Sequence, residues 1–434
     1  MLQGHGDDIF QYPDIRMNFS SNIFAHADMS ELKAHLCRNI HLIDNYPEPS
    51  PHSLKQLIAS KAGVSPDSVL VTNGATEAIY LIAQALVSIQ SVQASDPSSQ
   101  ASVPSSQALV PSSQASVSSS QASVPSSQAL VSSSQASVPS SQASVSSVQV
   151  ESAPPHIAPC THFCTGPQPT FSEYADASLL QGLKEEKWSP VTPPIEPIMP
   201  IMPIMPIPSK KPIPQKKPIP QNNPPTLLWL CNPNNPTGSI YTPSEISDLA
   251  RRYTYVVVDQ SYEDLTLAPM MTPREAAASQ NIIQIHSLTK TYAIPGLRIG
   301  YVVASPTVVG MLRRYVRPWS VNALAIEAGQ WLLNHDLKAV PDLPVYLEET
   351  QRLRQQLNLI PGIETAPTHT NFILGRVATT TAACLKDALA RHYHILIRDA
   401  SNFSGLTPHH FRVSAQTPEE NNFLVRAIRA TMKA

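Results

Sequence analysis

Short apolar runs alternate with helix-forming stretches along much of this chain. LLWLC, YVVVD, IIQIH and IGYVVA, at residues 227–231, 255–259, 282–286 and 299–304, have the length and composition of buried strands. TEAIYLIAQALV, at residues 76–87, spaces its apolar residues along one face of a helix. Strands that alternate with helices predict an α/β fold, with a mostly parallel sheet covered on both faces. Ligands of such sheets bind at the carboxyl ends of the strands.

A serine- and glutamine-rich repeat interrupts this pattern. From residue 98 to 146 the chain repeats SSQASVP with small variations. A period of seven is typical of coiled coils, but each repeat holds one valine, at most one leucine and often a proline, so no apolar seam is continuous. So little apolar surface does not offset the backbone entropy lost on ordering, about 1 to 2 kcal/mol per residue. We therefore predict a disordered insert over residues 90–155.

A proline-rich stretch forms a second predicted insert, at residues 189–225. It includes PIEPIMPIMPIMPIPSKKPIPQKKPIPQNNPP, in which proline recurs every two or three residues. Because proline lacks a backbone donor, helix and central strand are both excluded, and polyproline II is the expected conformation. An SH3-type ligand, a stiff spacer and an unselected low-complexity expansion all remain open interpretations.

Composition narrows the class of protein. The chain has 434 residues, 42% of them hydrophobic, which suffices for a substantial core and more than one domain. Lys plus Arg number 30 and Asp plus Glu number 32, so charge gives no indication of a nucleic-acid or polybasic membrane partner. The start, MLQGHGDDIF, lacks a signal-peptide pattern and nowhere do 18 apolar residues follow one another, so we expect a soluble, cytoplasmic protein. Five scattered cysteines form no disulfide framework, which suits a reducing compartment.

One cysteine and histidine cluster has the ligand types of a zinc site. His156, Cys160, His162 and Cys164 lie within nine residues. Their spacing fits no common zinc finger, so we predict no metal.

Polar residues follow several of the expected strands. TNGATEAI, at 72–79, runs from a glycine turn into a helix, whose free N–H groups form an anion site or a plain turn. In CNPNNPTG, at 231–238, two prolines and a glycine aim Asn235 above the sheet. Asp259 ends an apolar run, where a carboxylate needs a partner. A protonated ring nitrogen and a helix N-cap are the two alternatives for it.

Lys290 lies in SLTKTYAIPGLRIGY, between small hydroxyl residues and eight positions before Arg298. A lysine that reacts covalently requires a neutral nitrogen that is shielded from water. Lys290 is therefore the candidate nucleophile of the chain.

In this order along the chain, these motifs resemble the pyridoxal 5′-phosphate enzymes of fold type I, the class I and II aminotransferase family. The resemblance implies that Lys290 is the Schiff-base lysine, that Asp259 pairs with the pyridine nitrogen, and that Asn235 and Tyr262 donate to the ring hydroxyl. Tyr174, in PTFSEY, resembles the aromatic residue that stacks on the ring. The implied phosphate cup comprises Gly74, Ala75, Thr76, Ser287, Thr289 and Arg298. Tyr46 is similar to the tyrosine that reaches the cofactor phosphate of a neighbouring subunit, which implies a homodimer.

Within the family, three stretches resemble the subgroup of L-threonine-O-3-phosphate decarboxylases of cobalamin biosynthesis, with the histidinol-phosphate aminotransferases next. They are SLTKTYAIPGLRIGY, RPWSVNALA and ILIRDASNFSGL. The resemblance implies that Arg412 holds the substrate α-carboxylate, that Arg398 meets the substrate phosphate, and that Asn371 and His5 also bind substrate. Asp7 departs from this pattern, since the subgroup usually has glycine there.

Three functions are therefore weighed: a decarboxylase that forms (R)-1-amino-2-propanol O-2-phosphate, a histidinol-phosphate-type aminotransferase, and a non-catalytic scaffold on a decayed fold. The expected domains are an amino-terminal segment 1–45 that joins the small domain, a cofactor-binding large domain 46–304, and a small α+β domain 305–434. The family has a helix and a strand where this chain is proline-rich. Either the seven-stranded type of sheet lacks a strand here, or the inserts loop out and ASLLQGLKEEKW, at 177–188, supplies the helix.

Overall fold

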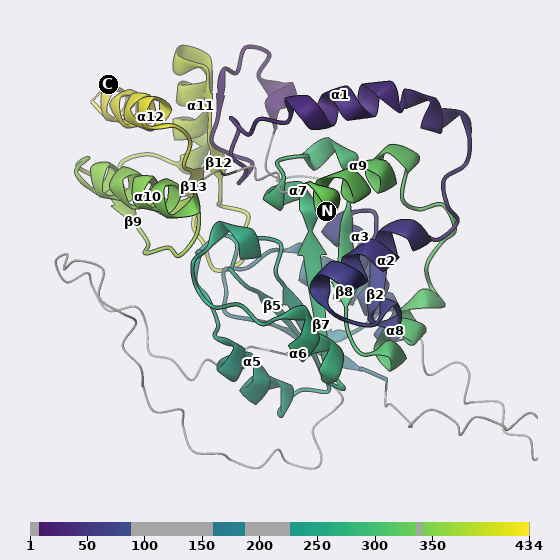
Figure 1. Cartoon of the computed structure of the whole chain (residues 1–434). Helices are drawn as coiled ribbons and strands as arrows, with labels where there is room; N and C mark the ends of the chain where they lie inside the picture. Colours follow the sequence, from purple (N-terminus) through teal and green to yellow (C-terminus); the bar gives the residue numbers. More distant parts are fainter. Residues whose placement is uncertain (1–7, 88–158, 187–225, 336–339, 341, 434) are drawn as a thin grey trace, which may run out of the picture. The chain divides into compact units, whose positions relative to one another are not determined.

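The computed structural model describes residues 8–87, 159–186, 226–335, 340 and 342–433 (Figure 1). Both predicted inserts, 90–155 and 189–225, lie outside the described residues, as do His5 and His156. All described residues belong to one unit, formed by residues 1–91 and 157–434.

A seven-stranded sheet is the centre of this unit, in the order β2-β8-β7-β6-β5-β3-β4. Parallel pairing joins β4 to β3, β3 to β5, β5 to β6 and β6 to β7, whereas β8 is antiparallel to both of its neighbours. The strands are β2 (Val69–Thr72), β3 (His162–Thr165), β4 (Lys184–Glu185), β5 (Thr226–Cys231), β6 (Tyr255–Asp259), β7 (Ile282–Ser287) and β8 (Gly300–Val303). The predicted α/β class with a mostly parallel sheet is confirmed.

The sheet keeps its seventh strand despite the proline-rich stretch. β3 lies in the sequence between residues 88–158 and 187–225, which the structure does not describe. It pairs with β5, and the two-residue β4 completes the edge of the sheet. The sequence interpretation of residues 177–188 is half right, since helix α4 spans Glu173–Leu180 and β4 follows it. Cys160 and Cys164, considered above as zinc ligands, are instead buried around β3. Among the described residues, no three His, Cys, Asp or Glu side chains are placed to hold a metal ion.

Helices cover both faces of the sheet because alternate strand residues point to opposite sides. On one face, Val257 and Ile285 pack with α3 (Gly74–Val87), α4 and α8 (Pro306–Arg313). On the other face, Val256 and Val258 pack with α5 (Pro243–Ala250) and α6 (Pro273–Ala278). On that same side, Val69 and Val71 pack with α2 (His52–Ala62) and α9 (Ala323–Asn334).

The chain leaves and re-enters the first face at adjacent points. α3 ends at Val87, and the backbone N–H of Cys160 donates to the carbonyl of Leu86 at 3.0 Å. Both points lie towards the amino end of β3.

A second, antiparallel sheet has the order β12-β13-β10-β9. Its strands are β9 (Ile363–Thr365), β10 (Phe372–Val377), β12 (Arg398–Asp399) and β13 (His410–Ser414). α10 (Leu343–Asn358), α11 (Ala382–Tyr393) and α12 (Pro418–Thr431) share its core.

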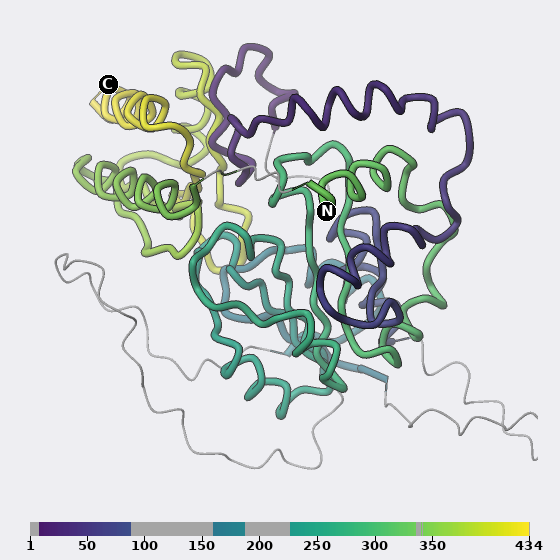
Figure 2. Tube along the Cα trace, viewed as in Figure 1, coloured from purple at the N-terminus to yellow at the C-terminus, as the bar shows by residue number. Residues whose placement is uncertain are grey.

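The amino-terminal segment joins both cores (Figure 2). β1 (Met17–Asn18) pairs in parallel with β11 (Ile395–Leu396), and Phe19 is buried in the core of the second sheet. Further along, α1 (Ser30–Arg38) packs with α9 in the core of the large sheet. The predicted domain boundaries at residues 45/46 and 304/305 stay predictions, although α8 and α9 pack with the large sheet.

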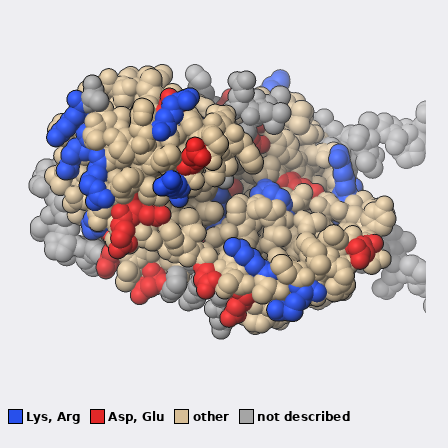
Figure 3. All heavy atoms as spheres, turned by 90° about the horizontal axis from the view of Figure 1, so that it is seen from above, with Lys and Arg blue, Asp and Glu red and all other residues tan. Residues whose placement is uncertain are grey.

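The surface agrees with the near balance of charge. Figure 3 presents a face on which basic and acidic side chains both occur. Among the described ranges, no helix has the length and apolar character needed to cross a membrane.

Candidate active site

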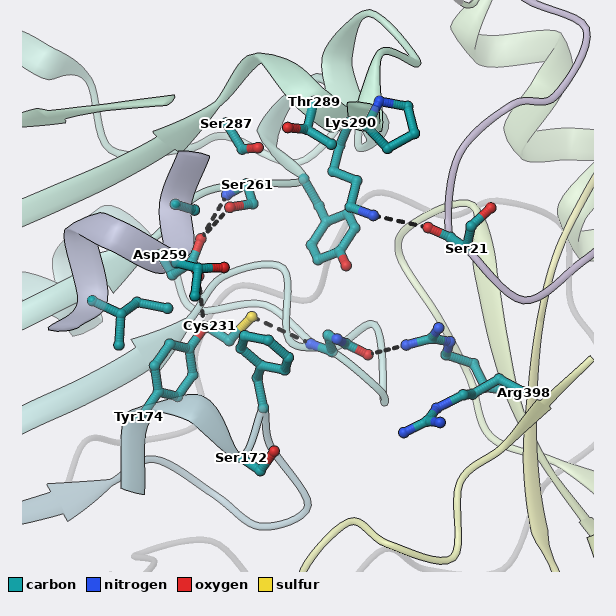
Figure 4. Close-up of a pocket in the computed structure, with 18 of the residues that line it drawn as sticks. Ser21, Ser172, Tyr174, Cys231, Asp259, Ser261, Ser287, Thr289, Lys290 and Arg398 are labelled. Carbon is teal, nitrogen blue, oxygen red and sulfur yellow. Dashed lines mark hydrogen bonds between the residues drawn. The ribbon is translucent and has the colours of Figure 1, made fainter. Parts of the chain in front are cut away.

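A cavity of about 360 Å³ opens where the carboxyl ends of β5, β6 and β7 meet the first turn of α3 and the strands β12 and β13 (Figure 4). Residues predicted from seven separate motifs line it together. They are Ala75, Thr76, Tyr174, Asn235, Asp259, Tyr262, Ser287, Thr289, Lys290, Arg298, Arg398 and Arg412. The sheet topology accounts for this convergence, because parallel strands end at the same edge.

Lys290 lies on the short helix α7 (Leu288–Thr291), which directly follows β7. Its Nζ donates to the carbonyl of Ser21 at 2.8 Å, and Figure 4 shows the side chain pointing into the cavity. The amine is therefore held at the pocket by the amino-terminal segment of the chain.

Asp259, at the carboxyl end of β6, is buried with 4% of its surface exposed. Its Oδ1 accepts from the Ser261 N–H at 2.9 Å and from the Ser261 hydroxyl at 2.5 Å, and its Oδ2 accepts from the Tyr174 hydroxyl at 2.8 Å. Burial raises the pKa of Asp259, while these hydrogen bonds and the nearby His286 oppose the rise. The N-cap alternative is wrong, because the next helical turn, Glu263–Leu265, has Tyr262 in that position.

The phosphate end of the site lies at the start of α3. Gly74 has φ +77°, and a Cβ built there would lie 2.7 Å from Nη2 of Arg298. Thr289 Oγ1 is buried without a hydrogen-bond partner among the described residues. Free N–H groups at a helix start, a guanidinium and an orphaned hydroxyl together fit a phosphate group.

Substituting Gly74 by alanine tests this cup. Alanine at a left-handed φ costs about 1 to 2 kcal/mol, and here its Cβ also displaces Arg298. We expect the affinity for pyridoxal 5′-phosphate to fall about tenfold, as the loss of one charge-assisted hydrogen bond predicts. Thermal unfolding and equilibrium binding measure the two effects.

Gly182 supplies the matched control for that substitution. It has φ +78° and no atom within 4 Å of a built Cβ. Gly182→Ala should show the same backbone cost with unchanged cofactor affinity. Equal losses of affinity in both variants would contradict the assignment of Arg298 to the phosphate.

Asn235 and Tyr262 face the same cavity. Asn235 Oδ1 accepts from Nη1 of Arg412, and the Tyr262 hydroxyl accepts from Nδ2 of Asn22 at 3.3 Å. Burial raises the pKa of Tyr262 to about 12, although the charge of Arg412 lowers it. Tyr262 is therefore neutral at physiological pH and can donate a hydrogen bond into the pocket.

The predicted stacking role of Tyr174 stays a prediction, although the structure shows a close partner for its ring. Its ring is buried and lies against Trp229, with centroids 5.4 Å apart and planes 10° from parallel, so one face of the ring is occupied. Phe171, three residues earlier, is half-buried, lines the cavity and contacts Tyr174 edge-on. The ring of Phe171 is therefore accessible from the cavity.

Two arginines form the opposite wall. Arg398 of β12 and Arg412 of β13 are register partners, with 5% and 4% of their surfaces exposed. Arg398 donates to Asn402 Oδ1 at 2.7 Å, and Arg412 donates to the carbonyl of Ser20 at 2.7 Å. Burial lowers the pKa of Arg412 to about 10, and the charge of Arg398 adds to this. An anion in the cavity would relieve both effects.

Other predicted residues lie elsewhere. Asn371 is 0% exposed and donates to the Tyr346 hydroxyl at 3.3 Å, outside the cavity lining, and its role as a substrate ligand stays a prediction. Tyr46 is 84% exposed and contacts the Trp319 ring at 5.4 Å, away from this cavity. His5 lies outside the described residues.

Sequence reasoning assigned no role to several lining residues: Ser20, Ser21, Phe171, Cys231, Ser261 and Asn402. Ser261 carries a local signal, since a serine two positions after an aspartate commonly closes a turn onto the carboxylate. Ser21 carries none, because its backbone carbonyl makes the contact.

Comparisons with known proteins agree with this geometry. The model of the aminotransferase class I and II family matches residues 213–428. Threonine-phosphate decarboxylase of Salmonella typhimurium is 34% identical over 209 residues, 46% of this chain and 56% of that protein. Histidinol-phosphate aminotransferase of a Thermoanaerobacter species is 32% identical over 209 residues, 47% of this chain and 57% of that protein. The aligned part thus spans little more than half the length of these curated relatives.

A solved structure extends the likeness. L-threonine-O-3-phosphate decarboxylase from Porphyromonas gingivalis superposes with a TM-score of 0.70 at 27% identity, covering 96% of this chain and all of that one. Fold, site and matches define the class of fold-type I proteins that use pyridoxal 5′-phosphate. Within that class, residues 213–428, just under half of the chain, match the class I and II aminotransferase family. The predicted family and cofactor are confirmed.

Proposed function

We propose that this protein decarboxylates L-threonine O-3-phosphate to (R)-1-amino-2-propanol O-2-phosphate, as a cytoplasmic enzyme of cobalamin biosynthesis. The observation that carries the proposal is the pair of buried arginines, Arg398 and Arg412, in the same cavity as Lys290 and Asp259. Two guanidinium groups at one cavity favour a substrate with two anionic groups, because arginine binds carboxylate and phosphate in a bidentate manner. Phosphothreonine carries a carboxylate and a phosphate.

The relatives support the same choice. The Salmonella and Porphyromonas proteins are both named as decarboxylases of threonine phosphate, and the second covers nearly the whole chain. Histidinol-phosphate aminotransferases match at similar identity, so the aminotransferase is the second candidate. The scaffold alternative has less support, because the cavity brings the lysine, the aspartate and both arginines together.

Decarboxylation breaks the bond between the α-carbon and the carboxylate carbon, releases carbon dioxide, and returns a proton to the α-carbon. When bound, pyridoxal 5′-phosphate supplies an electron-withdrawing ring that accepts the electron pair of the broken bond. Lys290 would hold the cofactor covalently and, once displaced, deliver the proton from Nζ as a general acid. Asp259 would hold the ring nitrogen.

Orientation decides which bond breaks, because the bond perpendicular to the ring plane is the one that is weakened. Arg398 and Arg412 lie on adjacent strands and contact Asn402 and Asn235 respectively, which limits their movement. Anchoring two ends of one substrate on these fixed groups would set the angle at the α-carbon.

We also propose a homodimer. Tyr46 and Trp319 form an exposed aromatic pair, 84% and 50% exposed, outside the cavity. A partner subunit that covered this pair would bring Tyr46 close to the neighbouring cofactor phosphate, as the family resemblance implies. Sedimentation equilibrium of the purified chain measures the oligomeric state.

A direct assay tests the proposed reaction. The purified protein with pyridoxal 5′-phosphate and phosphothreonine should release carbon dioxide and aminopropanol phosphate in equal amounts. Formation of both products without any keto acid identifies a decarboxylase.

Amino transfer from histidinol phosphate that requires a keto acid would contradict the proposal and support the aminotransferase. Neither reaction, together with no visible absorbance in excess cofactor, would support the scaffold.

A further inference from the structure

Tyr174 is fully buried, and its hydroxyl contacts the carboxylate of Asp259. The hydroxyl donates to Oδ2 of Asp259 at 2.8 Å, from the opposite side to Ser261, which donates to Oδ1 (Figure 4). The ring is fixed by its stack on Trp229, whose indole N–H donates in turn to the Ser178 hydroxyl at 2.9 Å. Trp229, itself held by Ser178, thus fixes the ring of Tyr174, and Asp259 fixes its hydroxyl.

A hydrogen bond that is donated to a carboxylate favours its charged form. Asp259 has little access to water, so its ionisation depends on such donors. We propose that Tyr174 is a positioning residue that keeps Asp259 ionised and thereby keeps the ring nitrogen of the bound cofactor protonated. The inference rests on one part of the proposed function, namely that the cofactor binds with its ring nitrogen beside Asp259. It does not depend on which reaction follows.

Other titratable groups face Asp259 from the elements packed around it. Cys231 on β5, His286 on β7 and Tyr262 after β6 interact with it electrostatically, and Lys290 lines the same cavity. Burial raises the pKa of Cys231 to about 12 and that of Tyr174 well above its ordinary value, so both are neutral near pH 7. The Tyr174 hydroxyl is therefore available as a donor over the whole working range of pH.

His286 has another carboxylate as a partner. Its Nδ1 lies 2.5 Å from Oε1 of Glu263, and no direct hydrogen bond joins it to Asp259 among the contacts of the carboxylate described above. Direct donation by Tyr174 and Ser261 is the more effective way to stabilise the carboxylate of Asp259.

The test uses pyridoxal 5′-phosphate labelled with ¹⁵N in the ring, bound to wild type and to Tyr174→Phe. Phenylalanine keeps the stack on Trp229 and removes only the donor. The ¹⁵N chemical shift reports whether the ring nitrogen carries a proton. We expect the pH at which this proton is lost to be lower in the variant by about one unit, since a hydrogen bond to a charged group contributes about 1.5 to 3 kcal/mol.

Tyr255→Phe is the matched control. Tyr255 is also a buried tyrosine beside this sheet, on the same strand as Asp259, but its hydroxyl has no hydrogen-bond partner among the described residues. This variant should titrate as wild type does. An unchanged midpoint in Tyr174→Phe, or equal shifts in both variants, overturns the inference.

Folding is followed by thermal unfolding of each variant. A Tyr174→Phe protein that does not fold also overturns the inference, because the hydroxyl would then serve packing and not the charge of Asp259. Wild type that shows the protonated ring nitrogen but does not decarboxylate phosphothreonine would sink the proposed function and leave this inference intact.

Discussion

Replacing Lys290 by alanine is expected to lower the decarboxylation rate by at least about a thousandfold. General acid or base catalysis alone contributes about 10² to 10⁴ in rate, and this variant also loses the covalent hold on the cofactor. The variant also loses the hydrogen bond that Nζ donates to the carbonyl of Ser21, so its folding has to be followed alongside its rate. Single-turnover kinetics and thermal unfolding measure the two effects separately.

Chemical rescue provides the control for this variant. A small amine such as methylamine fits the space left by the lysine side chain and should restore part of the rate in proportion to its concentration. Activity within tenfold of wild type without added amine would exclude Lys290 from the proton transfer.

Replacing Arg412 by glutamine is expected to lower kcat/KM for phosphothreonine by about 10³. Arg412 is 4% exposed, and removing one partner of a buried, hydrogen-bonded charge pair costs about 2 to 5 kcal/mol. Glutamine keeps hydrogen-bonding capacity towards Asn235 and the carbonyl of Ser20, so cofactor absorbance should remain. Steady-state kinetics with intact cofactor loading tests the expectation.

Arg376→Gln is the control for Arg412, since Arg376 lies on the adjacent strand β10. Its side chain is 44% exposed and is 3.6 Å from Glu364. Exposed pairs of this kind contribute about 1 kcal/mol or less, so this variant should keep its kcat/KM. Similar kinetics for the two variants would remove Arg412 from substrate binding.

Much of the large sheet could be predicted because its strands are buried on both faces. Such strands are continuous apolar runs, so β5, β6, β7 and β8 stand out in the sequence. β3 does not stand out, because its first residue is the polar His162 and it lies between two segments of unusual composition. Pairing with β5, more than 60 residues away, makes it a strand.

The site was predictable where function depends on side chains at strand ends, as with Asp259 and Lys290. Tyr174 and Phe171 show the limit of that reasoning. The two aromatic residues are three positions apart near the start of α4, and both line the cavity. Local pattern therefore does not tell which ring is free to stack on a ligand. The stack of Tyr174 on Trp229 occupies one face of the Tyr174 ring, and it joins residues 55 positions apart in the chain, beyond the reach of any local pattern.

The amino-terminal residues were the hardest part of the site to foresee. Ser20, Ser21 and Asn22 contact Arg412, Lys290 and Tyr262, through two backbone carbonyls and one side chain. Backbone contacts leave no trace in residue type, and these join positions 240 to 392 residues apart.

The hydrogen bond between Cys160 and Leu86 makes this corner of the fold a permissive place for chain insertion. The two ends of the intervening sequence are held together by the fold itself, about 20 Å from the start of α3, given 14 helical residues at about 1.5 Å each. Lengthening a loop whose ends already meet costs only about 0.6 kcal/mol for each doubling. The length of the sequence inserted at this point can therefore change without moving the residues of the site at the other end of the same helix.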